Sequence, residues 1–168
     1  MTHDSPRELT EVLNWRRVSA QISTSGQPTE SQLADLAAGG VSHVVNLGPH
    51  DNDGALEDEA GSVAALGMTY VYLPVDFQDP RDADFDAFCD TLARLDGERI
   101  HVHCLYNARV SAFFYRHARE CRGDTIGETV DTAFARMDGI WRPGGVWARF
   151  IGDDSALDTP NRFKGYEY

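Results

Sequence analysis

One short segment of the sequence combines a cysteine, an arginine and a helix start in a way that could do chemistry. It runs from His103 to Ser111 and reads HCLYNARVS. Cys104 follows a predicted buried strand, and a predicted helix begins after a short turn. Backbone N–H groups in such a turn and at a helix N-terminus form a cradle that binds anions. The same groups stabilise a thiolate, so we expect Cys104 to be an acidic thiol.

Arg109 completes this pattern. Its planar guanidinium suits a tetrahedral oxyanion, and four residues, Leu105 to Ala108, separate it from Cys104. A nucleophilic thiolate, an anion cradle and an arginine are the parts that thiol-phosphate chemistry needs. We therefore predict a catalytic site at Cys104 and Arg109. The residues predicted to form its anion-binding loop are Leu105, Tyr106, Asn107, Ala108, Val110 and Ser111. The competing interpretation is a small buried cysteine beside a surface arginine.

The elements that must position this segment alternate between strand and helix patterns. Strands are predicted at residues 18–23, 43–47, 68–74 and 99–103. Capping boxes and apolar residues at helical spacing predict helices at 5–14, 29–38, 57–66, 85–96, 107–122, 129–141 and 146–151. This alternation predicts an α/β fold, with a central, mostly parallel sheet of four or five strands flanked by helices on both faces. Ligands bind such sheets at the carboxyl ends of the strands, where Cys104 falls.

Length, composition and charge narrow the function classes. A chain of 168 residues with 42% hydrophobic residues is expected to fold as a single domain over residues 1–168. A net charge of −12 argues against nucleic acid or an anionic membrane surface as a partner. We interpret the acidic runs at 51–59 and 76–90 as an adaptation for solubility. The N-terminus lacks a signal-peptide pattern, no apolar run approaches a membrane helix, and three cysteines give no disulfide framework, so we expect a cytoplasmic protein.

The order of the motifs resembles a known family. The segments STSGQPT, GVSHVVNL, TYVYLPV and HVHC follow one another between Arg17 and Glu120, and IWRPGGVW comes later. In this order they resemble the dual-specificity-like protein tyrosine phosphatases, most closely their small bacterial branch. The resemblance implies a cysteine-phosphatase-like fold and hydrolysis of phosphomonoesters through a cysteinyl-phosphate intermediate. The implied substrate is a phosphorylated small molecule or a phosphoprotein, with phosphate or sulfate able to occupy the loop and no cofactor needed.

The sequence departs from the family's signature, which has five residues between the cysteine and the arginine. In one interpretation the loop is one residue short and Arg109 still serves the anion. In the other the loop has its usual length, Val110 replaces the arginine, Ser111 keeps the hydroxyl position and Asn107 stands where a glycine is common, because Asn tolerates left-handed backbone. The second interpretation predicts an impaired phosphatase or a phosphate-binding pseudophosphatase. A rhodanese-like sulfurtransferase, whose loop is similarly short, is a further alternative.

The resemblance also implies a general acid in the loop PVDFQDPRD, which follows the third predicted strand. Asp76 and Asp79 are the candidates, and Asp76 lies nearer the strand end. His103 is expected to hold the loop by hydrogen bonding. We predict no metal site, since the histidine and cysteine spacing matches no usual zinc pattern, and we interpret Cys89 and Cys121 as packing residues.

Overall fold

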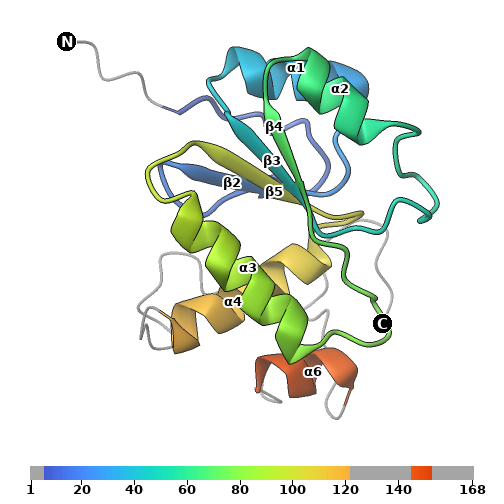
Figure 1. Ribbon diagram of the computed structural model, residues 1–168, viewed down its shortest axis with the longest axis vertical. Helices are drawn as coiled ribbons and strands as arrows, with labels where there is room; N and C mark the ends of the chain where they lie inside the picture. The colour runs from blue at the N-terminus through green and yellow to red at the C-terminus, as the bar shows by residue number, and fades with distance from the viewer. Residues whose placement is uncertain (1–5, 122–144, 153–168) are drawn as a thin grey trace.

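The sheet of the protein is mixed, with one antiparallel edge. The computed structural model describes residues 6–121 and 145–152 (Figure 1). Its five strands follow the order β1-β2-β5-β3-β4. The strands are β1 (Arg16–Arg17), β2 (Ile22–Ser25), β3 (His43–Asn46), β4 (Thr69–Tyr72) and β5 (Ile100–His103). Among these described strands, only β1 runs antiparallel to its neighbour, and the other three pairings are parallel.

Helices cover both faces of this sheet. The described helices are α1 (Glu30–Ala38), α2 (Glu59–Ala65), α3 (Asp82–Arg94), α4 (Ala108–Glu120) and α6 (Val146–Ile151). Helices α1 and α2 lie on one face, whereas α3 and α4 lie on the other with α6 beside them (Figure 1). The predicted fold class is therefore confirmed. The helix expected at 129–141 lies outside the described residues.

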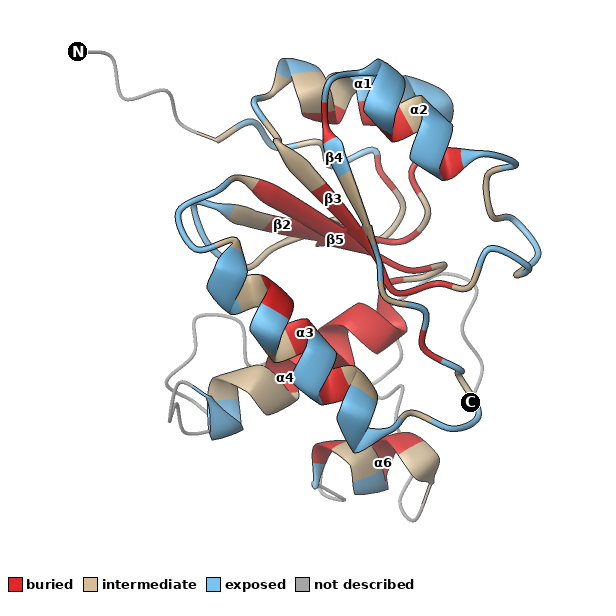
Figure 2. Cartoon of the chain, in the orientation of Figure 1, coloured by how far each residue is buried: buried red, intermediate tan, exposed pale blue. Residues whose placement is uncertain are grey.

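Two apolar clusters hold the layers together. The alternation of side chains along a strand sends Val44 of β3 toward α1 and α2, and its neighbour Val45 toward α3 and α4. The larger cluster includes Phe88 of α3 and Phe113 of α4, whose rings meet edge to face at 5.3 Å. Every residue of β5 is buried, as expected for the central strand of a parallel sheet (Figure 2). The strand that leads to Cys104 is thus the most enclosed one.

The parallel strands end at one level. His103, the last residue of β5, is in register with Ser25 of β2 and with Asn46 of β3, and Asn46 is in register with Tyr72 of β4. The loops after these residues therefore leave the same edge of the sheet. Cys104 and the segment that contains Asp76 both belong to these loops.

The N-terminal segment differs from its prediction. The helix expected at 5–14 is absent from the described part, 6–14, where tight turns join Leu9 to Val12 and Val12 to Trp15. The carbonyl of Leu13 instead accepts from the N–H of Gly26, and Val12 is buried. These long-range contacts outweigh the local capping pattern. The strand expected at 18–23 is a turn between β1 and β2 for most of its length.

Among the described residues, no helix combines the length and the apolar character needed to cross a membrane.

Candidate active site

Cys104 lies directly after β5, at the edge of the sheet where the parallel strands end. Cys104 is only 1% exposed, and its backbone N–H donates to the carbonyl of Ser25 at 3.4 Å. The next residue, Leu105, accepts through its carbonyl from the N–H of Gln27 at 2.9 Å. The turn after β2 therefore supports the Cys104 loop from below. This support places the thiol at a fixed position at the base of the site.

A glycine permits this close approach. A Cβ atom on Gly26 would lie 2.6 Å from the carbonyl oxygen of Leu105, which is closer than real Cβ contacts allow. The absence of a side chain at Gly26 thus permits the close approach of the two backbone segments. Any larger residue at position 26 must displace the Cys104 loop.

Asn107 ends the loop and starts α4. Its backbone is left-handed, with φ 74° and ψ 6°, the conformation that the sequence led us to associate with this asparagine. Its side-chain amide donates to the carbonyl of Asn14 at 2.8 Å and to the hydroxyl of Thr24 at 3.1 Å. Asn14 in turn donates to the carbonyl of Tyr106 at 3.0 Å. Hydrogen bonds to Asn14 and Thr24 therefore hold the end of the loop in place.

The start of α4 offers unused donors. The backbone N–H groups of Ala108, Arg109 and Val110 have no hydrogen-bond acceptor among residues 6–121 and 145–152. The first turn of the helix contains no acidic residue. Helix N-termini with free N–H groups carry a partial positive charge and attract anions. These groups follow Cys104 by four to six positions in the chain, and we expect an anion bound here to lie near the thiol.

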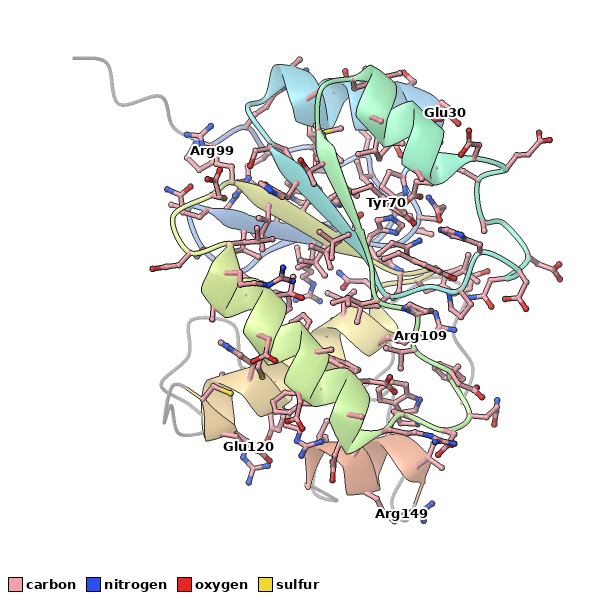
Figure 3. All side chains as sticks on the ribbon, in the orientation of Figure 1. Glu30, Tyr70, Arg99, Arg109, Glu120 and Arg149 are labelled. Carbon is pink, nitrogen blue, oxygen red and sulfur yellow. The ribbon has the colours of Figure 1, made fainter. Side chains whose placement is uncertain are left out.

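Arg109 contributes a buried charge to the same region. The residue is 6% exposed, and its Nε atom has no hydrogen-bond partner within the described part of the chain. Its guanidinium lies over the ring of Phe77 at 5.3 Å. Figure 3 shows Arg109 beside the loop that follows β4. A buried guanidinium donor without a partner is costly, and an oxyanion supplies the partner that it lacks.

The remaining predicted loop residues divide into two groups. Val110 and Ala108 are buried and belong to the larger apolar cluster. Ser111 is buried and its hydroxyl donates to the Asn107 side chain at 3.4 Å. Leu105 and Tyr106 are partly exposed and line a groove of about 600 Å³ beside the loop.

Behind the loop lies a buried polar network that the sequence did not predict. His103 hydrogen-bonds through Nδ1 to the carbonyl oxygen of Cys104 at 3.1 Å and through Nε2 to the carboxylate of Glu59 at 2.7 Å. Gln27 and Tyr70 also donate to Glu59. Burial raises the pKa of Glu59, but the hydrogen bonds from these three side chains and the charge of His103 hold it below its ordinary value. His103 therefore holds the loop, as the resemblance implied, and Glu59 holds His103.

Glu59 was hidden in the acidic run 51–59, which we interpreted as a solvated surface. It is only 2% exposed, whereas its neighbours Glu57 and Asp58 are exposed. Glu59 differs from the rest of the acidic run in being the first residue of α2, the helix that Asp58 caps. A buried carboxylate at that point reaches His103 on β5. No spacing in the sequence links residues so far apart.

The two candidate general acids lie in the loop after β4 and make different contacts. The Asp79 carboxylate pairs with Arg81 at 2.9 Å, and both side chains are exposed. Within the described residues, the Asp76 carboxylate accepts only from the backbone N–H of Gln78 at 2.9 Å, and its side chain is exposed. Phe77, the residue after Asp76, is the one that contacts Arg109. The indole of Trp147 donates to the carbonyl of Phe77 at 3.0 Å and fixes this contact.

His101 stays outside the site. It is fully buried on β5, between the hydroxyls of Ser23 at 2.8 Å and Ser25 at 2.7 Å. Burial, followed by the nearby charge of His103, lowers its pKa well below the ordinary value, so the ring is neutral. It is a structural histidine.

The fold defines the class of protein. It is that of the protein tyrosine phosphatase-like phosphatases. No family model matches the chain. A solved structure from Shewanella putrefaciens CN-32, titled "Putative phosphatase (DUF442)", is 32% identical, with 88% of this chain and 95% of that chain covered and a TM-score of 0.73. The chain therefore belongs to this phosphatase-like DUF442 family.

More distant relatives agree on the fold. TpbA of P. aeruginosa, solved in complex with pTyr, is 16% identical with a TM-score of 0.57, and the alignment covers 86% of this chain and 78% of that chain. At that identity the likeness shows the fold alone. The "Beta-lactamase hydrolase-like protein" of Agrobacterium fabrum is 24% identical over 125 residues, which cover 73% of this chain and 26% of the relative. The chain thus spans about a quarter of the length of that curated relative.

Proposed function

We propose that the protein hydrolyses phosphomonoesters, with Cys104 as the nucleophile and Arg109 as the residue that holds the phosphoryl oxygens. The observation that carries this proposal is the buried Arg109 guanidinium, whose Nε has no partner among the described residues, beside the free N–H groups that start α4. A dianionic phosphoryl group would satisfy both sets of donors at once. The substrate class is a phosphorylated small molecule or phosphoprotein.

The proposed reaction has two steps. The Cys104 thiolate attacks phosphorus, a sulfur–phosphorus bond forms, and the bond to the ester oxygen breaks. A protonated aspartic acid gives its proton to the departing oxygen. Water then attacks the phosphocysteine, the same carboxylate accepts the water's proton, and the sulfur–phosphorus bond breaks to return the thiolate.

Asp76 is the better candidate for the acid. Asp79 is engaged in an ion pair with Arg81, which competes for the position of its carboxylate. Asp76 has no cationic partner among residues 6–121 and 145–152, and it adjoins Phe77, which contacts Arg109.

The packing of Val110 supports the short-loop interpretation, whereas the left-handed backbone of Asn107 supports the normal-length one. Val110 is fully buried in the apolar cluster, whereas Arg109 has the unpartnered polar atom. An arginine at position 110 in this backbone would have to displace that cluster. The short spacing also favours a second candidate function, sulfur transfer through a Cys104 persulfide, because only four residues separate Cys104 from Arg109.

Hydrolysis of para-nitrophenyl phosphate tests the proposal. We expect Cys104→Ser to abolish turnover and Arg109→Ala to lower kcat/KM by about 10²–10³-fold, the usual effect of removing one donor to the transition state. Arg94→Ala, at an exposed arginine of α3, is the matched control and should leave turnover unchanged. Asp76→Asn should slow phenyl phosphate more than para-nitrophenyl phosphate, since the better leaving group needs less protonation.

Two results would contradict the proposal. One is phosphatase activity that survives in Cys104→Ser. The other is thiocyanate production from thiosulfate and cyanide by a protein that hydrolyses no phosphate ester, which would establish the sulfurtransferase instead. Vanadate-induced stabilisation against heat, measured on each variant, separates a lost catalytic group from a lost fold.

A further inference from the structure

A second group of reactive side chains lies far from Cys104, where α3 and α4 cross. Cys89 belongs to α3, and His117 and Cys121 lie at the C-terminal end of α4. The two helices cross each other on the same face of the sheet (Figure 1). The 13 residues of α4 separate the group from the Cys104 loop by about 20 Å at 1.5 Å per residue. The group therefore takes no part in the chemistry proposed for Cys104.

The three side chains converge on one point. The Sγ atoms of Cys89 and Cys121 are 3.3 Å apart, and one ligand atom from each of the three residues lies within 4.8 Å of the others. His117 and Cys121 are four residues apart on α4, a spacing that puts both on one face of a helix. Cys89 meets them from the neighbouring helix.

The surroundings keep this geometry rigid. Phe88, the residue before Cys89, is fully buried and packs edge-on against Phe113 and Phe114 at 5.3 and 5.1 Å. The same ring contacts the imidazole of His117 edge to face, at 6.1 Å and 89°. The imidazole orientation is thus set by the core. Cys121 is exposed and the other two are half-buried, so an ion could enter from solvent.

We propose that Cys89, His117 and Cys121 form a binding site for a thiophilic divalent transition metal of the Zn²⁺ type. Two thiolates and an imidazole are the ligands that Zn²⁺ prefers, at about 2.3 Å for sulfur and about 2.0–2.1 Å for nitrogen. They select against Mg²⁺ and Ca²⁺, which take oxygen ligands. Two thiolates also balance the charge of the ion, with a water at the fourth position. Bound metal would fasten α3 to the end of α4.

The competing interpretation is a redox pair. Two thiols at 3.3 Å could lose two electrons and two protons to an oxidant such as hydrogen peroxide and form a disulfide. A disulfide, however, makes no use of the third ligand. The placement of His117 within the same small volume therefore favours a metal.

Cobalt titration tests the proposal. The full-length protein, reduced and stripped with a chelator, is titrated with Co²⁺ under anaerobic conditions. We expect one equivalent to produce a thiolate-to-cobalt charge-transfer band and the visible bands of tetrahedral cobalt, both lost when Zn²⁺ is added. Cys89→Ser, Cys121→Ser and His117→Gln should each lose or strongly weaken the charge-transfer band. Cys104→Ser is the matched control and should keep it, because it removes a thiol outside the group.

The wild-type titration decides the question even where a variant folds poorly. Absence of the charge-transfer band in reduced wild-type protein would overturn the proposal. So would a band that persists in Cys89→Ser and disappears in Cys104→Ser. A Cys89–Cys121 disulfide in peptide mass spectra, with no metal bound by the reduced protein, would establish the redox pair instead.

Discussion

The buried pair of Glu59 and His103 makes the support of the Cys104 loop measurable. Glu59→Ala would remove the acceptor of three donors, His103, Gln27 and Tyr70, in a region where both members of the pair are at most 1% exposed at the side chain. Removing one partner of a buried ion pair costs about 3–5 kcal/mol, because the other group stays buried and uncompensated. Typical domains are stable by only about 5–15 kcal/mol, so we expect a large loss in urea unfolding.

Glu59→Gln is the milder variant and isolates the charge. Its side chain keeps one oxygen but must turn its amide NH₂ toward either His103 or Gln27, both of which donate to Glu59 in the native protein. We expect a loss of about 1–3 kcal/mol. Glu57→Gln changes an exposed acid two residues away and should alter stability by no more than about 0.5 kcal/mol.

The pH dependence provides the sharper measurement. Because the pKa of Glu59 is lowered in the folded protein, its ionised form adds stability that is complete above the unfolded pKa of about 4.3. That stability is lost as pH falls through the folded pKa. The gap between wild type and Glu59→Gln should thus be full at neutral pH and shrink below about pH 4. A gap that stays constant from acid to neutral pH would refute the assignment.

Two further variants test the backbone of the loop. Asn107→Ala should lower the free energy of unfolding in urea by about 2 kcal/mol, because alanine is strained in the left-handed conformation and cannot make the side-chain hydrogen bonds. Asn107→Gly should lower it by about 1 kcal/mol, because glycine accepts this conformation and loses only the hydrogen bonds. An alanine variant as stable as the glycine variant would contradict the strain argument. Gly26→Ala should lower kcat/KM for para-nitrophenyl phosphate by about 10²-fold, because the new Cβ must push the Leu105 carbonyl aside. Gly39→Ala serves as the control, because a Cβ at that position would lie 3.4 Å from its nearest neighbouring atom. Equal activity in the two glycine variants would show that the loop tolerates the displacement.

Local patterns predicted the elements that lie around the site. The capping box at Thr29 is present, with both reciprocal hydrogen bonds to Gln32, and α1 starts one residue later. The strand at 99–103 and the following helix also lie where apolar pattern and punctuation indicated. These features depend on neighbours a few residues apart, which a sequence displays directly. The same logic failed at 5–14, where Ser5 and Pro6 have the form of a helix start. There the chain instead hydrogen-bonds to the loops around Gly26 and Tyr106.

The parts of the site that the sequence could not predict come from long-range contacts. His103 and Glu59 are separated by 44 positions, and Phe77 meets Arg109 across 32 positions of chain. The acidic run also led to a wrong expectation for Glu59. Acidic runs are ordinarily solvated, whereas Glu59 is buried. Sequence separation also explains why Cys89 and Cys121 were interpreted as packing residues. The two cysteines come together where α3 and α4 cross, which their positions in the sequence do not indicate.

Two arginines of α4, Arg109 and Arg116, differ in their ionic partners. Both lie over aromatic rings, Arg109 over Phe77 and Arg116 over Phe85. Arg116 is also paired with two carboxylates, at 2.9 and 3.1 Å. In a chain with 27 acidic and 15 basic residues, a carboxylate is the expected neighbour of any arginine. Yet none pairs with Arg109 within residues 6–121 and 145–152, although it is far more buried than a surface arginine. A carboxylate at that point would compete with phosphate for the same donors, so its exclusion is what an anion site requires.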